Sequence, residues 1–330
     1  MPSVSVFGAA GYTGALSARL LHRHPSFELA AITGRTEAGR RLDELYPHHR
    51  VPLVLEELDL DRHAAVDAAV VAYPHGAAAE LVSALVARGV RVVDLSADFR
   101  LRDPAVYGEW YREHPEPGLL HGAVYGLPER YREQITGAEI VANPGCYPTA
   151  TLLALAPLAA AGLIADVVVD AKSGASGAGR AATEQTHFVT VDENVSAYGV
   201  PRHRHTPEIE QELAALGAEV RITFTAHLLP LDQGELVSCY VTPAGVFPDD
   251  LTALYRDFYA GEPFVELSDR PPGVRDVRET NLCRISVHRD ERTGRIIAFA
   301  VIDNLWKGAA SQAVQNLNLM FGRPEGEGIS

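Results

Sequence analysis

Residues 4–21, "VSVFGAAGYTGALSARLL", place an apolar run, a glycine-rich turn and a helical pattern in direct succession. The run has the length and composition of a buried strand, and the apolar residues after the turn recur at helical spacing. Gly8, Gly11 and Gly14 separate the two elements in a G-x-x-G-x-x-G pattern. Glycines at this place let the backbone approach a pyrophosphate, which then lies at the helix N-terminus. The stretch therefore predicts a dinucleotide-binding turn, and a plain tight turn is the alternative.

The rest of the chain falls into two patterns. Apolar, β-branched runs at 27–32, 68–74 and 91–96 alternate with helical segments. This alternation predicts a parallel sheet with crossover helices. Beyond residue 165, longer strand-like runs follow one another with few helices between them, which indicates a largely antiparallel sheet. We therefore predict an α/β fold with a Rossmann-type parallel-sheet domain and a second α+β domain that carries a mixed, largely antiparallel sheet.

The composition restricts the classes of partner. The chain of 330 residues has a formal net charge of −14, which argues against nucleic acid or an anionic membrane as the main partner. Its three cysteines are widely spaced, so neither a disulfide framework nor a zinc ribbon is expected. No apolar run is long enough to span a bilayer and no signal-peptide pattern opens the chain. We expect a soluble cytoplasmic protein with a small-molecule substrate.

The end of the second predicted strand indicates which dinucleotide is bound. NAD-preferring sites usually carry an acidic residue there for the ribose 2′-hydroxyl, but "AAITGRT" contains none before Glu37. Thr33 and Arg35 are suited to a 2′-phosphate, so NADP is the predicted cofactor. A solvated Arg35 without a ligand is the alternative. Further cofactor contacts in this part of the chain are predicted at Tyr12, Thr13, Pro74, His75 and Ser96.

Cys146 is the predicted nucleophile. It lies in "NPGCYPTA", between a strand-like run and a helix start, where backbone N–H groups and the helix dipole stabilise a thiolate. A thiolate can attack an acyl phosphate, expel phosphate and hold the acyl group as a thioester, which hydride from NADPH reduces to an aldehyde. The alternative is a small buried hydrophobe, an interpretation that suits Cys239 and Cys283.

The segment "RHRHTPEIEQEL", residues 202–213, supplies the predicted base for the thiol. Thr206 can cap a helix that has proline at its first position, which places His205 just before the cap and Glu208 one turn away. His205 is the predicted base and His203 its rival; a histidine that merely starts the helix is the alternative. Two histidines at this spacing also suit a metal, but no cysteine or third histidine lies near in the sequence, and the proposed chemistry needs no metal. We predict no metal.

Seven motifs run in order along nearly the whole chain, from about Val4 to Gly322: "GAAGYTG", "LSADFRLRDP", "VYGLPE", "NPGCYPTA", "KSGASGAGR", "HRHTPEIEQEL" and "DNLWKGAASQAVQNLNLMFG". Together they resemble the N-acetyl-gamma-glutamyl-phosphate reductases, which are related to aspartate-semialdehyde dehydrogenase. The resemblance implies NADPH-dependent reduction of N-acetyl-gamma-glutamyl phosphate to N-acetylglutamate 5-semialdehyde and phosphate, a step of arginine biosynthesis. It also implies that Cys146 is the nucleophile and that "HRHTPE" supplies the acid/base group.

The resemblance also implies a domain organisation and an assembly. The C-terminal helix would complete the first domain, which gives a dinucleotide-binding domain of residues 1–145 plus 305–330 and a catalytic and oligomerisation domain of residues 146–304. A homo-oligomer, either dimer or tetramer, is expected. The segment after Gly322 is expected to fray.

Further site residues follow from the chemistry and the resemblance together. The guanidinium of Arg100 suits the leaving phosphate, and a structural ion pair with Asp98 or Asp103 is the alternative. The glycine-rich loop "SGASGAGR" is predicted to wrap the nicotinamide side near Cys146, with a tight surface turn as the alternative. Lys307 could reach cofactor or substrate, cap a helix or pair with an acid. The remaining predicted contacts are Ser176, Gly177 and Asn304 for the cofactor, and Arg100, His203 and Glu208 for the substrate.

Three other functions share some of these sequence features. Short-chain dehydrogenases need a Tyr-x-x-x-Lys pair, which this sequence lacks. A reductase of a carrier-linked aminoadipyl phosphate, in lysine biosynthesis, would share the fold, the thiol and the cofactor. The arginine enzyme is favoured by the residues after the cysteine, Tyr147, Pro148 and Thr149, and by the net negative charge of the chain. A non-catalytic NADP-sensing protein would keep the glycine turn and Arg35, but it has no use for an activated cysteine.

Overall fold

The computed structural model describes residues 1–329 and divides into two compact units. Unit 1 comprises Met1–Gly145 and Ala309–Ser330, and unit 2 comprises Cys146–Gly308. The chain therefore returns to unit 1 at Ala309. From the sequence, this return was predicted at residue 305. Across the described residues, no helix has both the length and the apolar character that crossing a membrane requires.

Unit 1 is built on a six-stranded sheet with the order β2-β1-β3-β4-β6-β5, and every neighbouring pair is parallel. This confirms the predicted Rossmann-type sheet. The strands are short and almost wholly apolar because helices cover both faces of a parallel sheet. Their bounds are β1 (Ser3–Phe7), β2 (Glu28–Thr33), β3 (Ala68–Val71), β4 (Arg91–Asp94), β5 (Ala123–Tyr125) and β6 (Ile140–Ala142).

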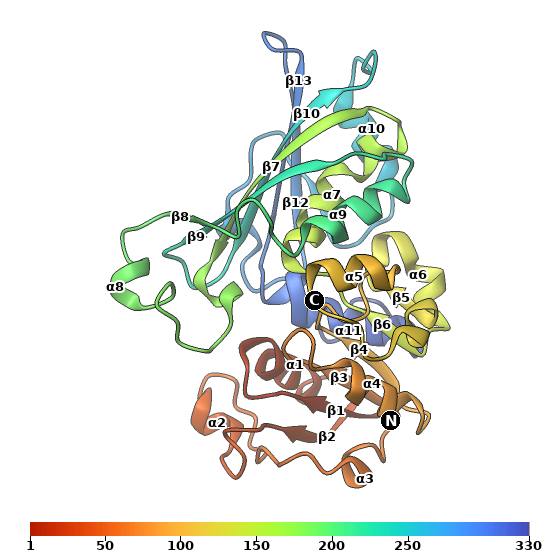
Figure 1. The fold of residues 1–330 in the computed structure, drawn as a ribbon, viewed down its shortest axis with the longest axis vertical. Helices are drawn as coiled ribbons and strands as arrows, with labels where there is room; N and C mark the ends of the chain where they lie inside the picture. The colour runs from red at the N-terminus through yellow and green to blue at the C-terminus, as the bar shows by residue number, and fades with distance from the viewer. Residues whose placement is uncertain (330) are drawn as a thin grey trace. The chain divides into compact units, whose positions relative to one another are not determined.

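The helices of unit 1 complete its core. They are α1 (Tyr12–His22), α2 (Leu42–Leu45), α3 (Leu60–His63), α4 (Ala79–Val86), α5 (Pro104–Trp110), η1 (Pro117–Gly122), α6 (Pro128–Thr136) and α11 (Ser311–Met320). Helix α4 packs on inward side chains of β1, β3, β4 and β6 in one apolar cluster. Helix α11, drawn in blue in Figure 1, lies among the N-terminal elements and contacts α1, α6 and β4.

Buried hydrogen bonds hold α11 in this place. Every residue of the helix is buried, and the Asn316 Nδ2 atom donates to the Gly126 carbonyl oxygen at 2.9 Å and to Asn143 Oδ1 at 3.0 Å. The expectation that the chain frays after Gly322 is wrong for the described residues. Glu325 Oε2 lies 2.9 Å from Arg132 Nε, so an ion pair joins the C-terminal segment to α6.

Unit 2 is built on a seven-stranded sheet with the order β11-β12-β13-β10-β7-β9-β8. Among the described strands of this sheet, only β11/β12 and β7/β9 pair in parallel, which confirms the predicted mixed, largely antiparallel sheet. The strands are β7 (Ile164–Gly174), β8 (Ser196–Tyr198), β9 (Ile222–Leu229), β10 (Glu235–Pro243), β11 (Val265–Leu267), β12 (Cys283–Asp290) and β13 (Arg295–Ile302). The helical segments are α7 (Cys146–Ala160), η2 (Ala175–Ala178), α8 (Phe188–Val191), α9 (Thr206–Ala214), α10 (Leu251–Phe258) and η3 (Val274–Val277). A further segment, η4 (Trp306–Ala310), begins in unit 2 and ends in unit 1.

Helix α7 is the central helix of unit 2. It is apolar all round and buried from Tyr147 to Ala159, with contacts to four strands of the sheet and to α9 and α10. Pro157 inside the helix has no N–H to donate to the Leu153 carbonyl oxygen. The Tyr259 hydroxyl donates to that oxygen at 2.5 Å, so the buried acceptor is satisfied. The helix is thereby anchored, and its first residue has a defined place.

Candidate active site

Cys146 is the first residue of α7 and the one partly exposed thiol among the three cysteines. Its position at a helix start places the N–H groups and the positive end of the helix dipole beside the sulfur, which favours a thiolate. Cys239 and Cys283 are fully buried, as the sequence predicted. Burial raises the pKa of the Cys239 thiol, so that side chain stays protonated and unreactive.

Gly308 packs directly against Cys146. It lies in the short π-helical turn Trp306–Ala310, and a Cβ atom at this position would lie 2.8 Å from Cys146 Cβ and 3.3 Å from Cys146 Cα. Only glycine permits this approach, so the turn sets the position of the thiol. The sequence analysis missed this residue, although the glycine of "WKGAA" stands in a motif that it quoted.

Glu235 is a carboxyl group that the sequence analysis also missed. It opens β10, pairs in register with Ser173 and Ile302, and is fully buried. Burial raises the pKa of Glu235 to about 8, and the side-chain interaction with Cys146 acts in the opposite direction. The signal in the sequence was the alternation of "GELVSCY", which puts Glu235 on the same face as the buried Val237 and Cys239.

A cluster of aromatic rings surrounds the start of α7. The ring centroid of Tyr147 lies 5.6 Å from His203, 5.9 Å from His205 and 5.5 Å from Phe224. The Tyr198 hydroxyl donates to the Tyr147 hydroxyl oxygen at 3.1 Å. Burial raises the pKa of both tyrosines, so they remain neutral and provide a largely apolar wall next to the thiol. The structure therefore gathers both predicted histidines at the residue that follows Cys146.

The two histidines differ in how they are held. The backbone N–H of His205 donates to His203 Nδ1 at 3.2 Å, and burial lowers the pKa of His203 to about 4. His203 is therefore a neutral, fixed ring at neutral pH. Helix α9 begins at Thr206, so His205 itself is the N-cap residue; the predicted Thr206 cap is wrong. The Thr206 hydroxyl is buried without a hydrogen-bond partner in residues 1–329, and Glu208 is buried in the first turn of the helix.

The glycine-rich loop after β7 meets the segment after β13. The Asn304 Nδ2 atom donates to Ser176 Oγ at 3.1 Å, while Asn304 Oδ1 accepts the Gly234 N–H at 2.7 Å. A Cβ atom on Gly177 would lie 3.0 Å from Ser173 Oγ, so the loop is tightly packed there. The predicted contacts Ser176, Gly177 and Asn304 thus form one group. Gly234, whose N–H bonds to Asn304, is the residue directly before Glu235.

Lys307 does not face solvent. Its side chain is fully buried, and the ammonium lies 5.6 Å from the centroid of the Phe264 ring. A cation over an aromatic face is stabilised by the ring quadrupole. This contact gives Lys307 a structural role in unit 2, next to the glycine that packs on Cys146.

In unit 1, the glycine turn has the geometry that a pyrophosphate needs. Gly8 has a φ of +85°, and a Cβ atom there would lie 2.6 Å from the Ala72 carbonyl oxygen. A Cβ atom on Gly14 would overlap the Gly8 carbonyl oxygen and lie 2.9 Å from Ala9 Cα. Helix α1 has no side-chain cap and no acidic residue in its first turn, so its N–H groups are disposed to bind an anion.

Alanine substitutions in this turn separate binding from folding. A Cβ atom on Gly11 would lie 3.7 Å from the Gly8 carbonyl oxygen, an ordinary contact, so Gly11→Ala should cost about 1 kcal/mol of stability or less. The added methyl group would block the approach of a pyrophosphate, so NADPH affinity is expected to fall at least about tenfold. Gly14→Ala should instead destabilise unit 1 by about 3 kcal/mol. Fluorescence titration with NADPH and thermal unfolding measure both effects; a Gly11→Ala protein that binds NADPH like wild type would contradict this assignment.

The end of β2 supports the turn. The Gly8 N–H lies 3.4 Å from Thr33 Oγ1, the Tyr73 side chain also bonds to Thr33, and the threonine is only 2% exposed. The Thr33 hydroxyl therefore has a structural role, and a direct bond from it to a 2′-phosphate has no support here. Arg35 is exposed, and its positive charge is near enough to the Tyr73 hydroxyl to oppose the rise that burial causes in the pKa of Tyr73. Arg35 remains the candidate for the 2′-phosphate. Tyr12 and Thr13 are partly exposed at the start of α1, where they were predicted.

The "SADFR" motif is a network of buried bonds within unit 1. Ser96 is fully buried, and its hydroxyl donates to Asp94 Oδ2 at 2.6 Å and accepts the Asp98 N–H at 3.0 Å. The Asp98 carboxylate in turn accepts backbone N–H groups of residues 76, 78 and 79 at the start of α4. Burial raises the pKa of Asp94 to about 7. Ser96 thus shapes the loop before α4, and its contact with a cofactor stays a prediction.

The loop that this network shapes contains Pro74 and His75. Both are exposed, and His75 Nδ1 accepts the Ala97 N–H at 3.0 Å. Arg100, by contrast, is only 5% exposed, and its guanidinium donates to the Leu95 and Asn143 carbonyl oxygens, each at 2.8 Å. These contacts fix the guanidinium within unit 1. Its predicted role toward the leaving phosphate stays a prediction.

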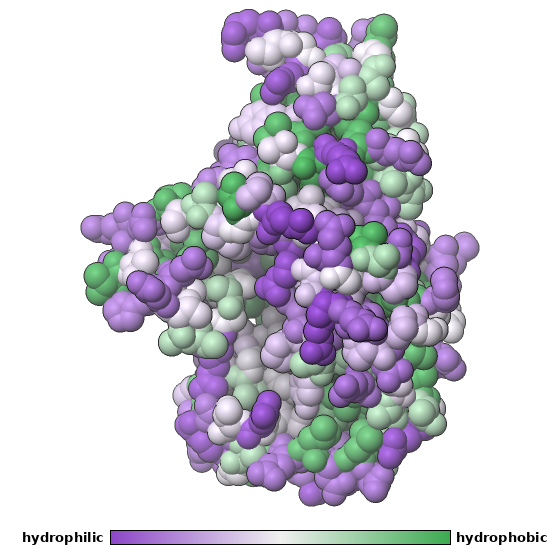
Figure 2. All heavy atoms as spheres, viewed as in Figure 1, coloured by the Kyte–Doolittle hydropathy of each residue, from purple (hydrophilic) through white to green (hydrophobic). Residues whose placement is uncertain are grey.

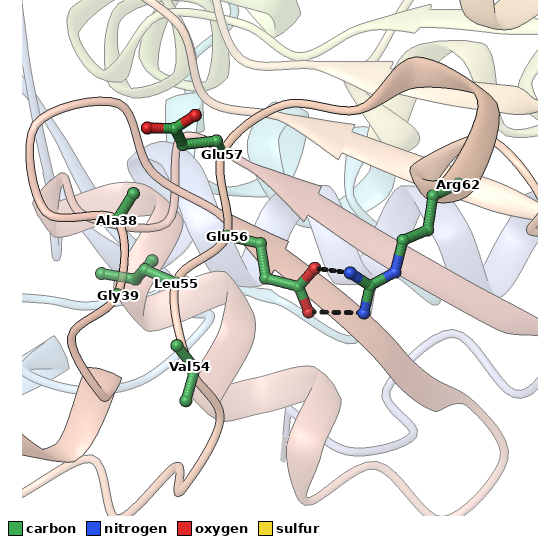
Figure 3. A pocket seen from close by; sticks show the side chains of 7 residues that line it. All are labelled: Ala38, Gly39, Val54, Leu55, Glu56, Glu57 and Arg62. Atoms are coloured by element: carbon green, nitrogen blue, oxygen red, sulfur yellow. Dashed lines mark hydrogen bonds and ion pairs between the residues drawn. The ribbon is translucent and has the colours of Figure 1, made fainter.

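A shallow hollow of about 520 Å³ lies beyond the β2 edge of the unit-1 sheet, near Arg35 in the sequence. Figure 3 shows its lining, with the Arg62 guanidinium paired to the Glu56 carboxylate. Glu56 also accepts a bond from the buried His63 at 3.1 Å. Arg62 and Glu56 thus neutralise each other, and the hollow contains none of the predicted site residues.

Comparison with known proteins places the chain in a family. Residues 3–138 match the model described as "Semialdehyde dehydrogenase, NAD binding domain", and residues 146–304 match "Semialdehyde dehydrogenase, dimerisation domain". The chain is 49% identical to the N-acetyl-gamma-glutamyl-phosphate reductase of Desulforudis audaxviator and 51% identical to that of Halorhodospira halophila, with 100% of this chain and 98% of each relative covered. The chain belongs to the N-acetyl-gamma-glutamyl-phosphate reductase family. This confirms the resemblance that the seven motifs carried.

Solved structures of other enzymes have the same fold as this chain. The structure matches an aspartate semialdehyde dehydrogenase II from Vibrio cholerae, complexed with ASA, with a TM-score of 0.74 at 20% identity over 98% of each chain. It matches the aspartate semialdehyde dehydrogenase with NADP from Candida albicans with a TM-score of 0.71 at 14% identity. At such identities the match concerns the fold: the N-acetyl-gamma-glutamyl-phosphate reductase family shares its two-unit architecture with the aspartate semialdehyde dehydrogenases.

Proposed function

We propose that this chain reduces N-acetyl-gamma-glutamyl phosphate to N-acetylglutamate 5-semialdehyde and phosphate with NADPH, as a step of arginine biosynthesis. The observation that carries the proposal is the placement of Cys146: a partly exposed thiol at the start of a buried helix, beside two histidines and a carboxyl group. Full-length relatives at about half identity bear the corresponding name.

The thiol performs covalent catalysis. The Cys146 sulfur attacks the acyl carbon, the carbon–oxygen bond to phosphate breaks, and phosphate leaves with the electron pair. The acyl group is then held as a thioester, whose carbon is more easily reduced than that of a carboxylate. NADPH, when bound, supplies the hydride. The carbon–sulfur bond then breaks, and Cys146 leaves as thiolate while the aldehyde forms.

His205 is the proposed acid/base group in this reaction. Its rival, His203, has a pKa lowered to about 4 and uses Nδ1 to accept the His205 N–H, so it cannot easily exchange a proton at neutral pH. His203 is better suited to bind substrate through its remaining nitrogen, and the buried Glu208 supports the helix start at which His205 stands. These roles stay proposals that the assay below, applied to His205→Asn and His203→Asn, would separate.

NADP fits the residues of unit 1. The uncapped start of α1 and the glycine turn would hold the pyrophosphate, and the exposed Arg35 would hold the 2′-phosphate. The loop before α4, with Pro74 and His75, is the proposed contact on the same cofactor. In unit 2, the group of Ser176, Gly177 and Asn304 would contact the nicotinamide side.

A homo-oligomer and a cytoplasmic location complete the proposal. On the sheet face of unit 2 opposite α7, apolar side chains remain partly exposed at Val168, Leu236, Tyr240, Ile297 and Phe299. Figure 2 shows further apolar surface around α8, where Phe188 and Val189 are 75% and 78% exposed. Surfaces of this kind are typical of subunit contacts. Three free thiols suit a reducing compartment.

The reaction run in reverse tests the proposed function. Purified protein is mixed with N-acetylglutamate 5-semialdehyde, NADP and phosphate, and the absorbance of NADPH is followed. We expect NADPH to form only when phosphate is present, and more slowly with NAD. The carrier-linked aminoadipate semialdehyde serves as the competing substrate. Faster turnover of that substrate, or no turnover by a folded protein that binds NADP, would contradict the arginine assignment.

A further inference from the structure

We propose that Glu235 is a catalytic residue that takes the Cys146 thiol proton as the thioester forms, holds it while the thioester exists, and returns it to the sulfur when the aldehyde leaves. The inference rests on the proposed function and deepens it. It assigns to a carboxyl group the proton that the sequence analysis assigned to a histidine.

The first support is that Glu235 has no structural task in the sheet. It is fully buried at the start of β10, and within residues 1–329 neither carboxyl oxygen has a hydrogen bond of acceptable geometry. The backbone of the residue carries the strand pairing with Ser173 and Ile302, which needs no particular side chain. A buried carboxyl group that lacks a well-formed hydrogen bond is costly, so its presence calls for a reason other than folding.

The second support is its position. The inward face of β10 carries Glu235, Val237 and Cys239, and α7 packs on β10 with Cys146 as its first residue. Glu235 interacts with the Cys146 side chain, which is the reacting group. The charges of both groups also raise the pKa of Tyr147 and of Tyr198. Glu235 is thus the carboxyl group at the wall of the cluster that contains the nucleophile.

The third support is that the two groups can exchange one proton at little cost. Burial raises the pKa of Glu235 to about 8, close to that of an ordinary thiol, and the nearby Asp303 acts in the same direction. The other titratable groups around the site are Tyr147 on α7, Tyr198 on β8, and His203 and His205 before α9. The tyrosines and His203 stay neutral, and Glu235 is the buried carboxyl group that acts on the thiol itself.

The proton and the bonds balance over the cycle. The reacting state is the one in which Cys146 and Glu235 together hold one proton. From it the sulfur–carbon bond forms, the carbon–oxygen bond to phosphate breaks, and the thiol proton passes to the Glu235 carboxylate. After hydride has been transferred, the carbon–sulfur bond breaks and the thiolate takes the proton back from Glu235. Both residues then return to their starting state, and His205 is left to give a proton to the departing phosphate, replaced from solvent.

Alkylation of the free protein tests the pairing without substrate or cofactor. The rate of Cys146 alkylation by iodoacetamide is measured against pH for wild type, Glu235→Gln and the control Glu212→Gln, which alters another fully buried glutamate, on α9. Because two coupled groups titrate in two steps, wild type and the control should show a two-step profile. Glu235→Gln should show one step. A single step in wild type, or identical profiles in wild type and Glu235→Gln, would overturn the proposal.

Turnover supplies the second measurement. In Glu235→Gln we expect kcat to fall about 10²-fold or more with little change in KM, because the amide fills the same space but cannot accept a proton. A kcat within threefold of wild type would overturn the proposal. Inactivity of wild type toward N-acetylglutamate 5-semialdehyde would count against the proposed function alone, since the alkylation profiles do not involve that substrate.

Discussion

Cys146→Ser is expected to lower turnover by at least about 10⁴-fold while NADP binds with unchanged affinity. A serine hydroxyl in the same place keeps the shape of the site, but it is far harder to deprotonate and is a poor leaving group once the hydride has been transferred. The thiol begins α7 in unit 2, whereas the glycine turn that is proposed to hold the pyrophosphate lies in unit 1. Steady-state kinetics and fluorescence titration with NADPH measure the two properties on the same preparation.

A cysteine elsewhere provides the control for this substitution. Cys239 is fully buried in β10, so Cys239→Ser should leave turnover within a few fold of wild type apart from any loss of stability. If Cys146→Ser kept more than about a tenth of wild-type turnover, covalent catalysis by this thiol would be wrong.

Gly308→Ala is expected to lower turnover about 10²-fold, although residue 308 carries no reactive group. The added Cβ atom would lie 2.8 Å from Cys146 Cβ and 3.3 Å from Cys146 Cα, and neither atom is the far end of a flexible side chain. Cys146 must therefore shift, and a displacement of about 1 Å at a reacting atom can cost that factor. The same overlap should reduce the free energy of unfolding by about 1–3 kcal/mol.

The matched control for this variant is Gly245→Ala. Gly245 also lies in unit 2, but a Cβ atom there would meet nothing within 4 Å. We expect Gly245→Ala to match wild type in kcat and in thermal unfolding. A Gly308→Ala enzyme with kcat within threefold of wild type would show that the close packing of the π-helical turn does not position the thiol.

The features that could be predicted from the sequence are those determined by neighbouring residues. The turn of Gly8 to Gly14 follows from a strand, three glycines and a helix in succession, and the structure has each in its place. The difference between Cys146 and Cys239 was also local: one follows a Pro-Gly bend at a helix start, and the other alternates with apolar residues in a strand. Such patterns reveal both secondary structure and exposure.

The features that could not be predicted depend on contacts between distant parts of the chain. Glu235 and Gly308 reach Cys146 only because the register of β10 and the turn after β13 bring them to the start of α7. Ser96 and Arg100 carry polar side chains in a quoted motif, which suggested ligand contacts. In the fold their bonds go to Asp94 and to backbone carbonyl oxygens, because buried polar groups must be satisfied.

The proposed mechanism requires that the substrate becomes covalently bound to Cys146. The most direct test mixes the protein with N-acetyl-gamma-glutamyl phosphate in the absence of NADPH, quenches the mixture in acid and identifies the modified peptide by mass spectrometry. We predict an N-acetylglutamyl group on Cys146 alone, absent from Cys146→Ser and lost when NADPH is added before the quench. A protein that turns over with NADPH but shows no adduct, or carries one on another residue, would contradict the account.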